Sequence, residues 1–404
     1  MLAKASKKEN KEKKKYILPF CVCIEKFIVV RIGVNTRLLL KDRLEGIGYF
    51  TFQILKRITT WHKDIEFYFF FDRPYDADFV FSSNVKPIVL PLQSRHPVLW
   101  KIYFDFLLPI YCKKYKIDLF FSPENYLPKV DIPTICTVHD LNFMHNDAFI
   151  GNAMHQKYYL KYFPKNAIKA SSIATVSEYS KQDIIKTLGI EEEKITVVYS
   201  AANACFDSCT NVDIQAIKQK YTQGEDYFYF VGAISKRKNL EGIFSAFDIF
   251  KQENLNNKTK LVIIGNKKWW KGDIEQAYNI MKHKDEVVFT GRISSEEISK
   301  IAQGSIGLVF PSFFEGFGVP IIEAFQNNTA VITSNNTSLI EIASDAALLI
   351  DPYNNNAIAK AMTTLYNNPS LRQELIEKGK QRAKFFTWDK TAQRIWSIIE
   401  KYKQ

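Results

Sequence analysis

Short, nearly continuous apolar runs alternate with amphipathic helical patterns along the chain, and they do so in two separate series. Helical patterns such as residues 48–60 and 179–188 fall between the apolar runs. The first series predicts strands at residues 27–34, 65–71, 86–91, 117–123, 133–140, 171–177 and 194–200. The second predicts strands at residues 227–233, 260–265, 286–291, 306–312, 329–334 and 346–351. Apolar strands that alternate with helices indicate parallel sheets covered by helices on both faces.

Two such series predict two domains, and a length of 404 residues agrees with that number. We expect an α/β protein with two doubly wound, Rossmann-like domains that face each other across a cleft. The expected divisions are a basic leader at residues 1–25, a first domain at 26–205, a second domain at 206–385 and a C-terminal segment at 386–404. Ligands of such sheets bind beyond the carboxyl ends of the strands, so the cleft is the expected binding site.

The net charge of +12 is partly local, because residues 1–15 hold seven lysines against Glu9 and Glu12. This composition is typical of a solvated tail. The remaining charge suits an anionic membrane surface and phosphorylated substrates, and no nucleic-acid motif appears. The apolar run at residues 16–24 lacks a cleavage site and is too short to span a bilayer. We therefore expect a protein without a transmembrane helix.

Glu315 and Glu323 stand at the most informative turn of the chain, between the strand at 306–312 and a helical pattern that Pro320 opens. Such a turn gathers backbone N–H groups and the positive end of a helix dipole, which suit phosphate. We expect Glu315 to project from the turn and Glu323 to lie in the first helical turn. Two carboxylates beside an anion site predict a ligand with hydroxyls and phosphate, as in a nucleotide sugar. The alternative is an ordinary helix N-terminus with a solvated Glu315.

Other strands of the second domain also end in candidate ligand groups. Arg237 and Lys238 follow the strand at 227–233, which includes the donor-binding candidate Gly232, and they are placed to neutralise a diphosphate. An exposed basic loop is the alternative interpretation. The remaining candidates for donor binding are Gly265, Lys267 and Lys268 after the strand at 260–265, and Arg292 and Ile293 after the strand at 286–291.

In the first domain, His139 ends the strand at 133–140, where it can bind a sugar hydroxyl or a phosphate, while Asp140 can instead cap the next segment. Gly46 and Gly48 open a helical pattern and permit close backbone approach to a ligand. A dinucleotide fingerprint needs a small residue where Thr51 stands, so a nicotinamide enzyme is disfavoured. A plain loop-to-helix turn remains the alternative for the two glycines.

Metal and redox signals are weak. Asp76 and Asp78 match the Asp-x-Asp pattern that can bind a metal diphosphate, but they lie in the first domain, away from the predicted phosphate site. We interpret them as a solvated turn and predict no metal and no cofactor. The six cysteines include no Cys-x-x-Cys pair, so we expect ordinary thiols in a reducing cytoplasm.

Several segments, in their order along residues 27–401, resemble glycosyltransferase family 4, which has the two-domain GT-B fold, and especially its bacterial mannosyltransferase-like members. The segments are RIGVNTRLLLKDRLEGIGYF, TICTVHDLNF, ATVSEYSKQDI, YFVGAISKRKNLEGIFSAF, LVIIGNKKWW, VVFTGRISSEEI, FPSFFEGFGVPIIEAF and SDAALLIDPYN. By this resemblance the first domain is the acceptor side, and residues 386–404 form a helix that packs back toward it. One departure is Ala233, where many members of the family carry arginine.

The resemblance implies a role for each candidate residue. Glu315 would contact the hydroxyls of the donor sugar, and Glu323 the ribose hydroxyls. The implied diphosphate ligands are Lys238, with Arg237 beside it, and the backbone N–H groups of Phe317, Gly318 and Val319. His139 would lie near the transferred sugar, and Gly46 and Gly48 would belong to a loop that closes over the substrates.

The implied reaction is metal-independent hexosyl transfer with retention, and GDP-mannose is the preferred donor by subgroup resemblance. The implied acceptor is a saccharide or a lipid-linked saccharide at the inner face of the cytoplasmic membrane. UDP-linked glucose, galactose or N-acetylhexosamine stays open as the donor. Three different functions also stay open: an inverting or phosphorylase-type member of the fold, a non-catalytic nucleotide-sugar-binding subunit, and a nucleic-acid binder recruited by charge.

Overall fold

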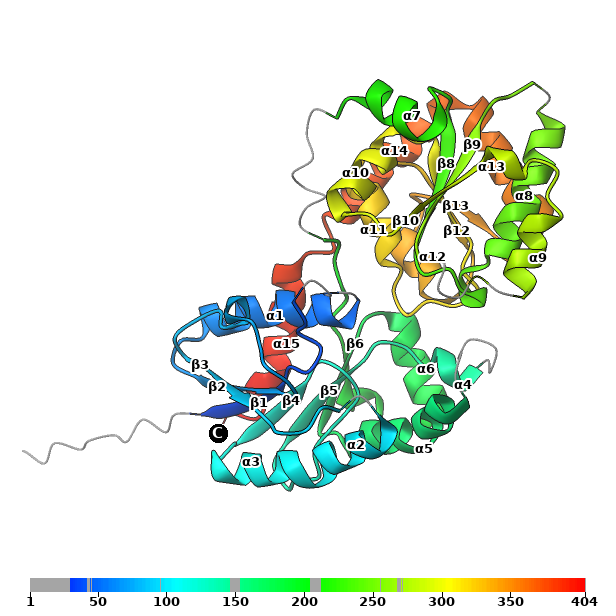
Figure 1. The fold of residues 1–404 in the computed structure, drawn as a ribbon. Coiled ribbons are helices and arrows are strands. Elements are labelled where there is room, and N and C mark those ends of the chain that lie inside the picture. Colours follow the sequence, from blue (N-terminus) through cyan, green and yellow to red (C-terminus); the bar gives the residue numbers. More distant parts are fainter. Residues whose placement is uncertain are drawn as a thin grey trace, which may run out of the picture.

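A computed structural model describes residues 30–41, 44, 46–94, 96–145, 153–203, 212–254, 256–266, 270 and 272–403. Within these ranges the chain forms two domains, each built on one parallel sheet with helices on both faces (Figure 1). The basic leader at 1–25, the expected boundary between residues 205 and 206, and Lys267 and Lys268 lie outside the described residues.

The sheet of the first domain has the strand order β3-β2-β1-β4-β5-β6-β7, and the neighbouring strands pair in parallel. Its strands are rich in phenylalanine and β-branched residues, and central strands such as β4 are buried along their whole length. The strands are β1 (Arg31–Asn35), β2 (Glu66–Phe71), β3 (Val85–Val89), β4 (Leu119–Ser122), β5 (Thr134–Val138), β6 (Ser172–Thr175) and β7 (Ile195–Val197).

The sheet of the second domain has the strand order β10-β9-β8-β11-β12-β13, again with parallel pairings. In both sheets the strand order reverses beside the first strand, β1 or β8, and such a switch point opens a crevice at the carboxyl ends. The strands are β8 (Tyr227–Val231), β9 (Lys260–Ile264), β10 (Val287–Gly291), β11 (Gly307–Phe310), β12 (Val331–Ser334) and β13 (Leu348–Ile350).

Helices connect the strands, and several begin at the polar caps that the sequence supplies. Ser177 caps α6 by accepting the N–H of Ser180 at 3.0 Å, and Asn239 caps α8 by accepting that of Gly242 at 3.1 Å. The first-domain helices are α1 (Ile47–Trp61), η1 (Ala77–Phe79), α2 (Pro97–Ile102), η2 (Tyr103–Leu107), α3 (Leu108–Lys114), α4 (Asn142–His145), α5 (Ala153–Lys169), α6 (Glu178–Leu188) and η4 (Glu192–Lys194).

In the second part of the chain strands and helices alternate as far as α13, and α14 and α15 then follow without a further strand. They are α7 (Ile214–Thr222), η6 (Lys236–Lys238), α8 (Leu240–Glu253), α9 (Asp273–Asn279), η8 (Lys284–Glu286), α10 (Ser295–Gly304), α11 (Val319–Gln326), α12 (Thr337–Ala343), α13 (Asn355–Asn367), α14 (Pro369–Ala383) and α15 (Trp388–Glu400). No helix among the described residues has the length and the apolar character that crossing a membrane requires.

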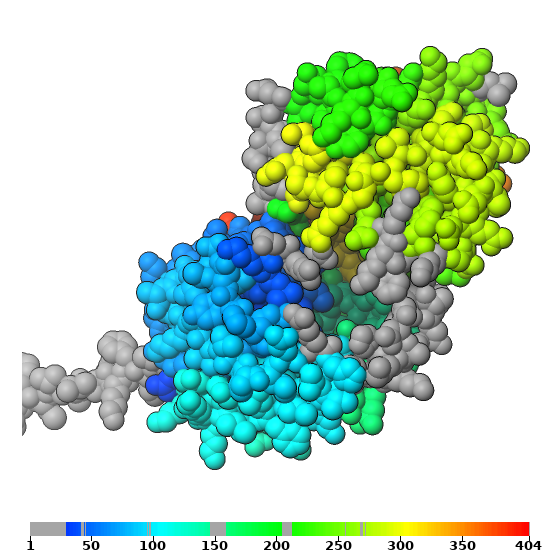
Figure 2. Space-filling view, viewed as in Figure 1, coloured from blue at the N-terminus to red at the C-terminus, as the bar shows by residue number. Residues whose placement is uncertain are grey.

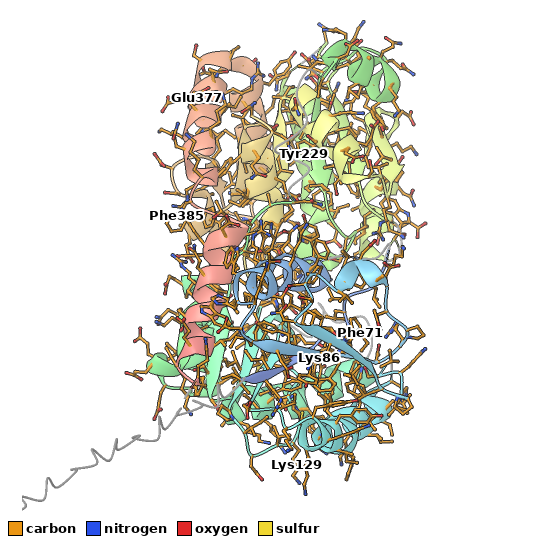
Figure 3. All side chains as sticks on the ribbon, turned by 90° about the vertical axis from the view of Figure 1, so that its left-hand side faces the viewer. Phe71, Lys86, Lys129, Tyr229, Glu377 and Phe385 are labelled. Carbon is orange, nitrogen blue, oxygen red and sulfur yellow. The ribbon has the colours of Figure 1, made fainter. Side chains whose placement is uncertain are left out.

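The last helix, α15, leaves the second domain and packs against α1 of the first (Figure 1). In Figure 3, Phe385 marks the level at which the chain passes between the domains, with Tyr229 above it and Phe71 below. The indole N–H of Trp388 donates to the carbonyl of Ala202 at 2.7 Å, and Arg57 pairs with Asp389 at 2.6 Å. These contacts tie the end of the chain to the first domain.

Candidate functional site

The centre of the site is an ion-pair cluster at the carboxyl ends of β8 and β11. Lys238 Nζ lies 2.6 Å from Glu315 Oε1, and Arg237 Nη1 lies 2.9 Å from Glu315 Oε2. Arg237 also donates to the carbonyl of Phe314 at 2.6 Å, and Lys238 Nζ lies 4.5 Å from the centre of the Phe310 ring. Glu315 and Lys238 are 7% and 8% exposed, which excludes both the solvated Glu315 and the exposed basic loop.

Hydrogen bonds to backbone carbonyls hold the two loops of this cluster together. Asn239 adopts a left-handed φ of 58°, which turns the chain from η6 into α8 directly after Lys238. The N–H of Phe313 donates to the carbonyl of Arg237 at 2.9 Å. Ser338 Oγ donates to the carbonyls of Glu315 at 2.8 Å and Phe317 at 3.0 Å. The cluster is therefore fixed by secondary-structure ends rather than by flexible side chains alone.

Charge in the cluster is balanced by burial and by pairing. Burial alone would raise the pKa of Glu315, but Lys238 and Arg237 outweigh it and hold the pKa at about 2. Burial also lowers the pKa of Lys238, against the opposing effect of Glu315. The site thus holds one carboxylate between two cations, with a net positive charge that suits an anionic ligand.

His139 and Asp140 stand opposite this cluster, at the end of β5 in the first domain. His139 Nε2 lies 3.0 Å from the carbonyl oxygen of Pro123. Because a carbonyl only accepts, Nε2 donates, and since burial lowers the pKa of His139 the neutral ring keeps Nδ1 as an acceptor. Asp140 accepts the N–H of Asn142 at 3.1 Å, and burial raises the pKa of Asp140.

Gly316, directly after Glu315, brings the two domains into contact. A Cβ atom at Gly316 would lie 2.2 Å from the carbonyl oxygen of His139, so only glycine permits this approach. The carbonyl of Gly316 accepts hydrogen bonds from Ser177 Oγ at 2.7 Å and Ser180 Oγ at 3.2 Å, both in the first domain. The segment that carries Glu315 is therefore attached to both domains.

Glu341 of α12 makes a second contact between the domains. Its carboxylate accepts the backbone N–H groups of Glu178 at 3.1 Å and Tyr179 at 3.2 Å, which are the first residues of α6. Free N–H groups and the positive end of the helix dipole favour a carboxylate at this position. A side chain of the second domain thus caps a helix of the first.

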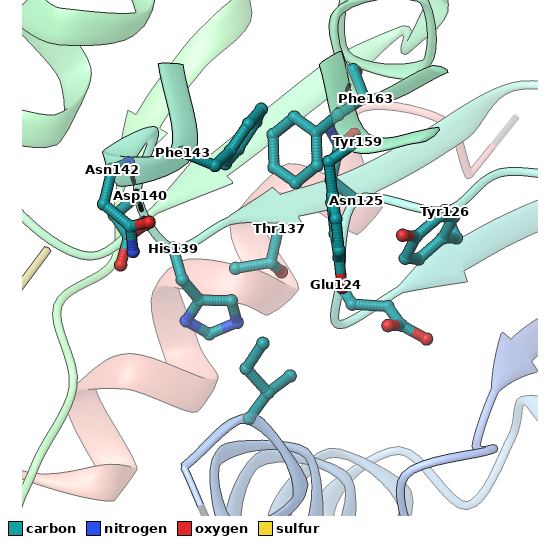
Figure 4. Close-up of a pocket in the computed structure, with 11 residues that line it drawn as sticks. Glu124, Asn125, Tyr126, Thr137, His139, Asp140, Asn142, Phe143, Tyr159 and Phe163 are labelled. Carbon is teal, nitrogen blue, oxygen red and sulfur yellow. Dashed lines mark hydrogen bonds between the residues drawn. The ribbon is translucent and has the colours of Figure 1, made fainter. Parts of the chain in front are cut away.

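A cavity of about 310 Å³ opens beside His139 in the first domain (Figure 4). Its wall combines polar groups with aromatic rings. The hydroxyl of Thr137 and the side-chain oxygen of Asn125 are buried, and neither has a hydrogen-bond partner among the described residues. The lining residues are Ile47, Glu124, Asn125, Tyr126, Thr137, His139, Asp140, Asn142, Phe143, Tyr159 and Phe163.

Glu124 of this cavity belongs to a buried ion pair at the ends of β1 and β4. Arg37 Nη2 donates to Glu124 Oε2 at 2.6 Å, and Asn35 Nδ2 donates to Glu124 Oε1 at 2.8 Å. The guanidinium of Arg37 lies 5.1 Å from the centre of the Tyr126 ring and 5.5 Å from that of Trp100. This wall of the cavity is therefore charged and tightly held.

Glu323 lies apart from the ion-pair cluster, and the prediction that it stands in the first helical turn was wrong. Helix α11 begins at Val319, one residue before Pro320, so Glu323 falls in the second turn. Burial raises the pKa of Glu323 to about 7, although the backbone N–H of Asn203 lowers it. Asn203 also accepts the Tyr49 hydroxyl at 2.6 Å and donates to Ser295 Oγ at 3.1 Å. Glu323 therefore faces the segment that connects the two domains.

The structure places the other predicted residues around the same edge. Gly46 has a φ of 45° and precedes α1, and a Cβ atom at Gly48 would lie 2.7 Å from the carbonyl oxygen of Leu38. Gly265 packs against Gly232 so closely that its Cβ would lie 2.1 Å from the Gly232 carbonyl oxygen. Phe317 is buried in the core, Gly318 caps α11 and Val319 begins it, while Arg292 is exposed and Ile293 is partly buried after β10.

Asp76 caps the short helix η1, and Asp78 lies within that helix. Asp76 accepts the N–H of Asp78 at 3.0 Å and pairs with Lys41 at 2.5 Å, far along the chain from the ion-pair cluster. The described residues contain no group of three or more His, Cys, Asp or Glu side chains that could hold a metal ion. Cys112 and Cys136 are buried free thiols, and the other four cysteines lie outside the described residues.

Known protein families match both domains. The family described as "Glycosyl transferases group 1" matches residues 213–382, and "Glycosyltransferase Family 4" matches residues 46–204. The chain belongs to glycosyltransferase family 4. It is therefore a glycosyltransferase with the GT-B fold, and each of the two sheets described above forms the centre of one domain of that fold.

Relatives of this glycosyltransferase include two proteins named for mannosyl transfer. The O-antigen chain mannosyltransferase B of Escherichia coli is 25% identical over 87% of this chain and 94% of its own. The O-antigen chain mannosyltransferase RfbU of Salmonella typhimurium is 29% identical over 68% of this chain and 72% of its own. Among solved structures, Anabaena Alr3699/HepE in complex with UDP-glucose has a TM-score of 0.67 at 15% identity, covering 92% of this chain and 99% of its own.

Several residues of this glycosyltransferase site escaped sequence reasoning. Gly316, Ser177 and Glu341 act through contacts between domains, which no local pattern indicates. Glu124 and Arg37 follow strand ends, as His139 does, and that position was the available signal. Their pairing depends on β1 and β4 being neighbours, which the topology fixes.

Proposed function

We propose that this glycosyltransferase moves a hexose from a nucleotide sugar to a saccharide or lipid-linked acceptor, with retention at the anomeric carbon. The observation that carries the proposal is the buried Glu315–Lys238–Arg237 cluster, which stands opposite His139 and beside the cavity of the first domain. Cations, a carboxylate and an apolar-polar cavity converge there, as a phosphorylated sugar donor and a hydroxyl acceptor require.

The donor diphosphate would bind Lys238, Arg237 and the backbone N–H groups of Phe317, Gly318 and Val319. Glu315 would accept hydrogen bonds from the hydroxyls of the sugar, and Glu323 from those of the ribose. His139 Nδ1 would accept a further sugar hydroxyl from the opposite domain. Except for Glu323, which lies in the second turn of α11, these groups lie at a strand end or helix start, where Rossmann-like domains bind ligands.

In the proposed reaction the bond between the anomeric carbon and the phosphate oxygen breaks, and its electron pair stays on the diphosphate. An acceptor hydroxyl attacks the anomeric carbon from the same face. The departing phosphate oxygen takes the hydroxyl proton, so no separate enzymic base is needed. Lys238 and Arg237 stabilise the negative charge that develops on the leaving group.

GDP-mannose is the donor we propose, because the relatives described above are named as mannosyltransferases. The acceptor we propose is a saccharide of a lipid-linked O-antigen or related cell-surface polysaccharide, bound in the 310 Å³ cavity. Unpartnered oxygens of Thr137 and Asn125 suit sugar hydroxyls, and aromatic rings suit the apolar faces of sugar rings. Such an acceptor would place the enzyme at the inner face of the cytoplasmic membrane.

A panel of nucleotide sugars tests the proposal. We expect GDP-mannose to raise the melting temperature more than UDP-glucose, UDP-galactose or UDP-N-acetylhexosamines do. We also expect the protein to release GDP from GDP-mannose slowly without acceptor, and Glu315→Ala to abolish this release while the circular dichroism spectrum is retained. Stabilisation by a UDP-sugar alone would move the donor to that class, and stabilisation without any turnover would indicate a binding subunit.

We further propose that the reaction needs no metal, because Lys238 and Arg237 supply the positive charge at the leaving group. Full turnover in EDTA is the expected result. A strict requirement for Mg²⁺ or Mn²⁺ would contradict the assignment of the two cations and would return attention to Asp76 and Asp78.

A further inference from the structure

A continuous helical stretch on the first domain, formed by α2, η2 and α3, exposes a row of large apolar side chains. Val98, Ile102, Phe106 and Ile110 are 60%, 43%, 61% and 62% exposed. They are spaced four residues apart, so they follow one another along one side of the stretch. We name these four residues the apolar row.

The other side of the same stretch is also apolar, but it is buried. Trp100, Tyr103, Phe104 and Leu108 pack into the core beneath the sheet. A helix that is apolar on both sides is normally covered on both sides. In this chain only the inner side is covered by described residues, so the apolar row is a patch of the kind that marks an interaction surface.

Lysines surround the apolar row. Lys101, Lys113 and Lys114 are exposed on the stretch itself, and Asp105, which is partly buried, is its one acidic residue. Lys129 adjoins the stretch, since its backbone N–H donates to the carbonyl of Phe104 at 3.1 Å, and Figure 3 shows it at the end of the domain remote from the second domain.

The neighbouring helix α5 has the same character on its outer side. The rings of Trp100 and Tyr159 lie 6.2 Å apart, which brings α2 and α5 together. Leu160 and Ile168 are 41% and 54% exposed. The exposed lysines 161, 165 and 169 accompany them, and residues 159–170 contain no acidic side chain.

We propose that the apolar row and its lysines dock on a membrane that contains anionic lipid. Apolar side chains would enter the boundary between headgroups and acyl chains, and the lysines would bind the anionic headgroups. The exposed charges on the stretch itself are all lysines, and an anionic membrane matches both these lysines and the apolar row. Figure 2 shows this part of the first domain, in cyan, on the side away from the second domain.

The surface adjoins the proposed acceptor cavity, so this inference rests on the proposed function. Tyr159 and Phe163 of α5 line the cavity, and Trp100 of α2 lies 5.5 Å from the ring of Tyr126 in its wall. Of the helices that would lie on the membrane, α5 therefore lines the cavity and α2 packs against its wall. A lipid-linked acceptor could remain anchored in the bilayer while its saccharide enters the site.

Vesicle sedimentation with the full chain tests the surface. The variant Phe106→Ser with Ile110→Ser removes two of the most exposed side chains of the apolar row. The matched control, Ile214→Ser with Ile280→Ser, removes two exposed residues of the second domain, which are 41% and 76% exposed. We expect wild type and control to bind vesicles containing phosphatidylglycerol equally, and the variant to bind at least about tenfold more weakly. All three proteins should bind vesicles of phosphatidylcholine alone more weakly than wild type binds vesicles that contain phosphatidylglycerol.

Equal binding by the variant and the wild type would overturn the proposal and assign any membrane binding to another segment, such as the lysine-rich residues 1–15. Equal binding to phosphatidylcholine and phosphatidylglycerol would remove the role of the lysines. No vesicle binding by wild type, together with a dimer that the variant converts to a monomer, would assign the row to a second copy. Donor stabilisation measured by thermal shift is a separate readout, so a wrong donor assignment would leave the vesicle result intact.

Discussion

In the free protein the carboxylate of Glu315 forms ion pairs with the two cations that the proposed diphosphate would bind. Lys238 and Arg237 both contact its carboxylate, at 2.6 Å and 2.9 Å. GDP lacks the transferred hexose, so it has none of the hydroxyls that Glu315 would bind in the donor. The carboxylate of Glu315 also repels the negative charge of the diphosphate. We therefore predict that Glu315→Gln strengthens the binding of GDP, even though it removes an essential group of the transfer reaction.

The size of the effect follows from the charge balance at Glu315. Its pKa falls from 4.5 to about 2, which corresponds to about 3 kcal/mol of net interaction favouring the carboxylate. This stabilisation of the fold is present above pH 4.5 and is lost as the pH falls toward 2, so at neutral pH the Gln variant lacks it. If diphosphate binding gives up about half of that energy, removing the carboxylate improves the dissociation constant about tenfold.

Isothermal titration with GDP and with GDP-mannose at neutral pH measures this directly. The Gln variant should bind GDP about tenfold more tightly than wild type. GDP-mannose should gain less, because its sugar loses the carboxylate. Asp273→Asn is a matched control: it frees Lys236, in the same turn as Lys238, from an exposed pair at 2.9 Å outside the cluster, and it should leave both affinities unchanged.

An affinity for GDP that is unchanged or weaker in Glu315→Gln would refute this reasoning. It would mean that the diphosphate does not compete with Glu315 for Lys238 and Arg237, so the phosphate site would lie elsewhere. The melting temperature without ligand separates this result from misfolding. It should be lower in the variant than in wild type, and GDP should restore more of it.

Three further predictions concern the remaining contacts of the site. The pKa of Glu323 is raised to about 7, so its ionised form and thus its binding of the ribose should grow between about pH 6 and 8. Its contribution to stability is present below pH 4.5 and is lost as the pH rises through about 7. Titrations of GDP should show the rise in affinity in wild type and a flatter profile in Glu323→Gln. Gly316→Ala should lower turnover about a hundredfold with little change in GDP affinity, because the new methyl group meets the His139 carbonyl at 2.2 Å. Glu341→Gln should weaken the contact with α6 and raise amide exchange at Glu178 and Tyr179, as hydrogen-exchange measurements would detect.

The sequence was sufficient to predict the fold because its signals are local. Each of the predicted apolar runs overlaps an observed strand, from β1 (Arg31–Asn35) to β13 (Leu348–Ile350). The observed strands are often shorter than the predicted runs, as β7 (Ile195–Val197) is within the run at residues 194–200. The family resemblance implied a final helix that packs back toward the first domain, and the structure has α15 in contact with α1.

The site was predictable only as far as strand ends could be recognised. Lys238, Arg237 and Glu315 were identified separately, but their mutual ion pairs depend on β8 and β11 being neighbours in the sheet. The turn of Glu323 was misplaced by a residue count, because α11 starts at Val319 rather than at Pro320. Arg37 and Glu124 lie 87 positions apart, and their pairing is visible only once β1 and β4 are adjacent.

Because Glu315 and Gly316 are adjacent, a change in the ion pairs of Glu315 can affect the contact between the domains. When a diphosphate binds, Glu315 must give up its ion pairs with Lys238 and Arg237. The backbone carbonyls of Glu315 and Phe317 accept hydrogen bonds from Ser338 Oγ at 2.8 Å and 3.0 Å. Gly316, between them, is bonded to Ser177 and packed on the His139 carbonyl. A backbone shift at Glu315 would therefore move Gly316 against the first domain. Donor binding and the contact between the domains are for this reason expected to be coupled, rather than to act as independent steps.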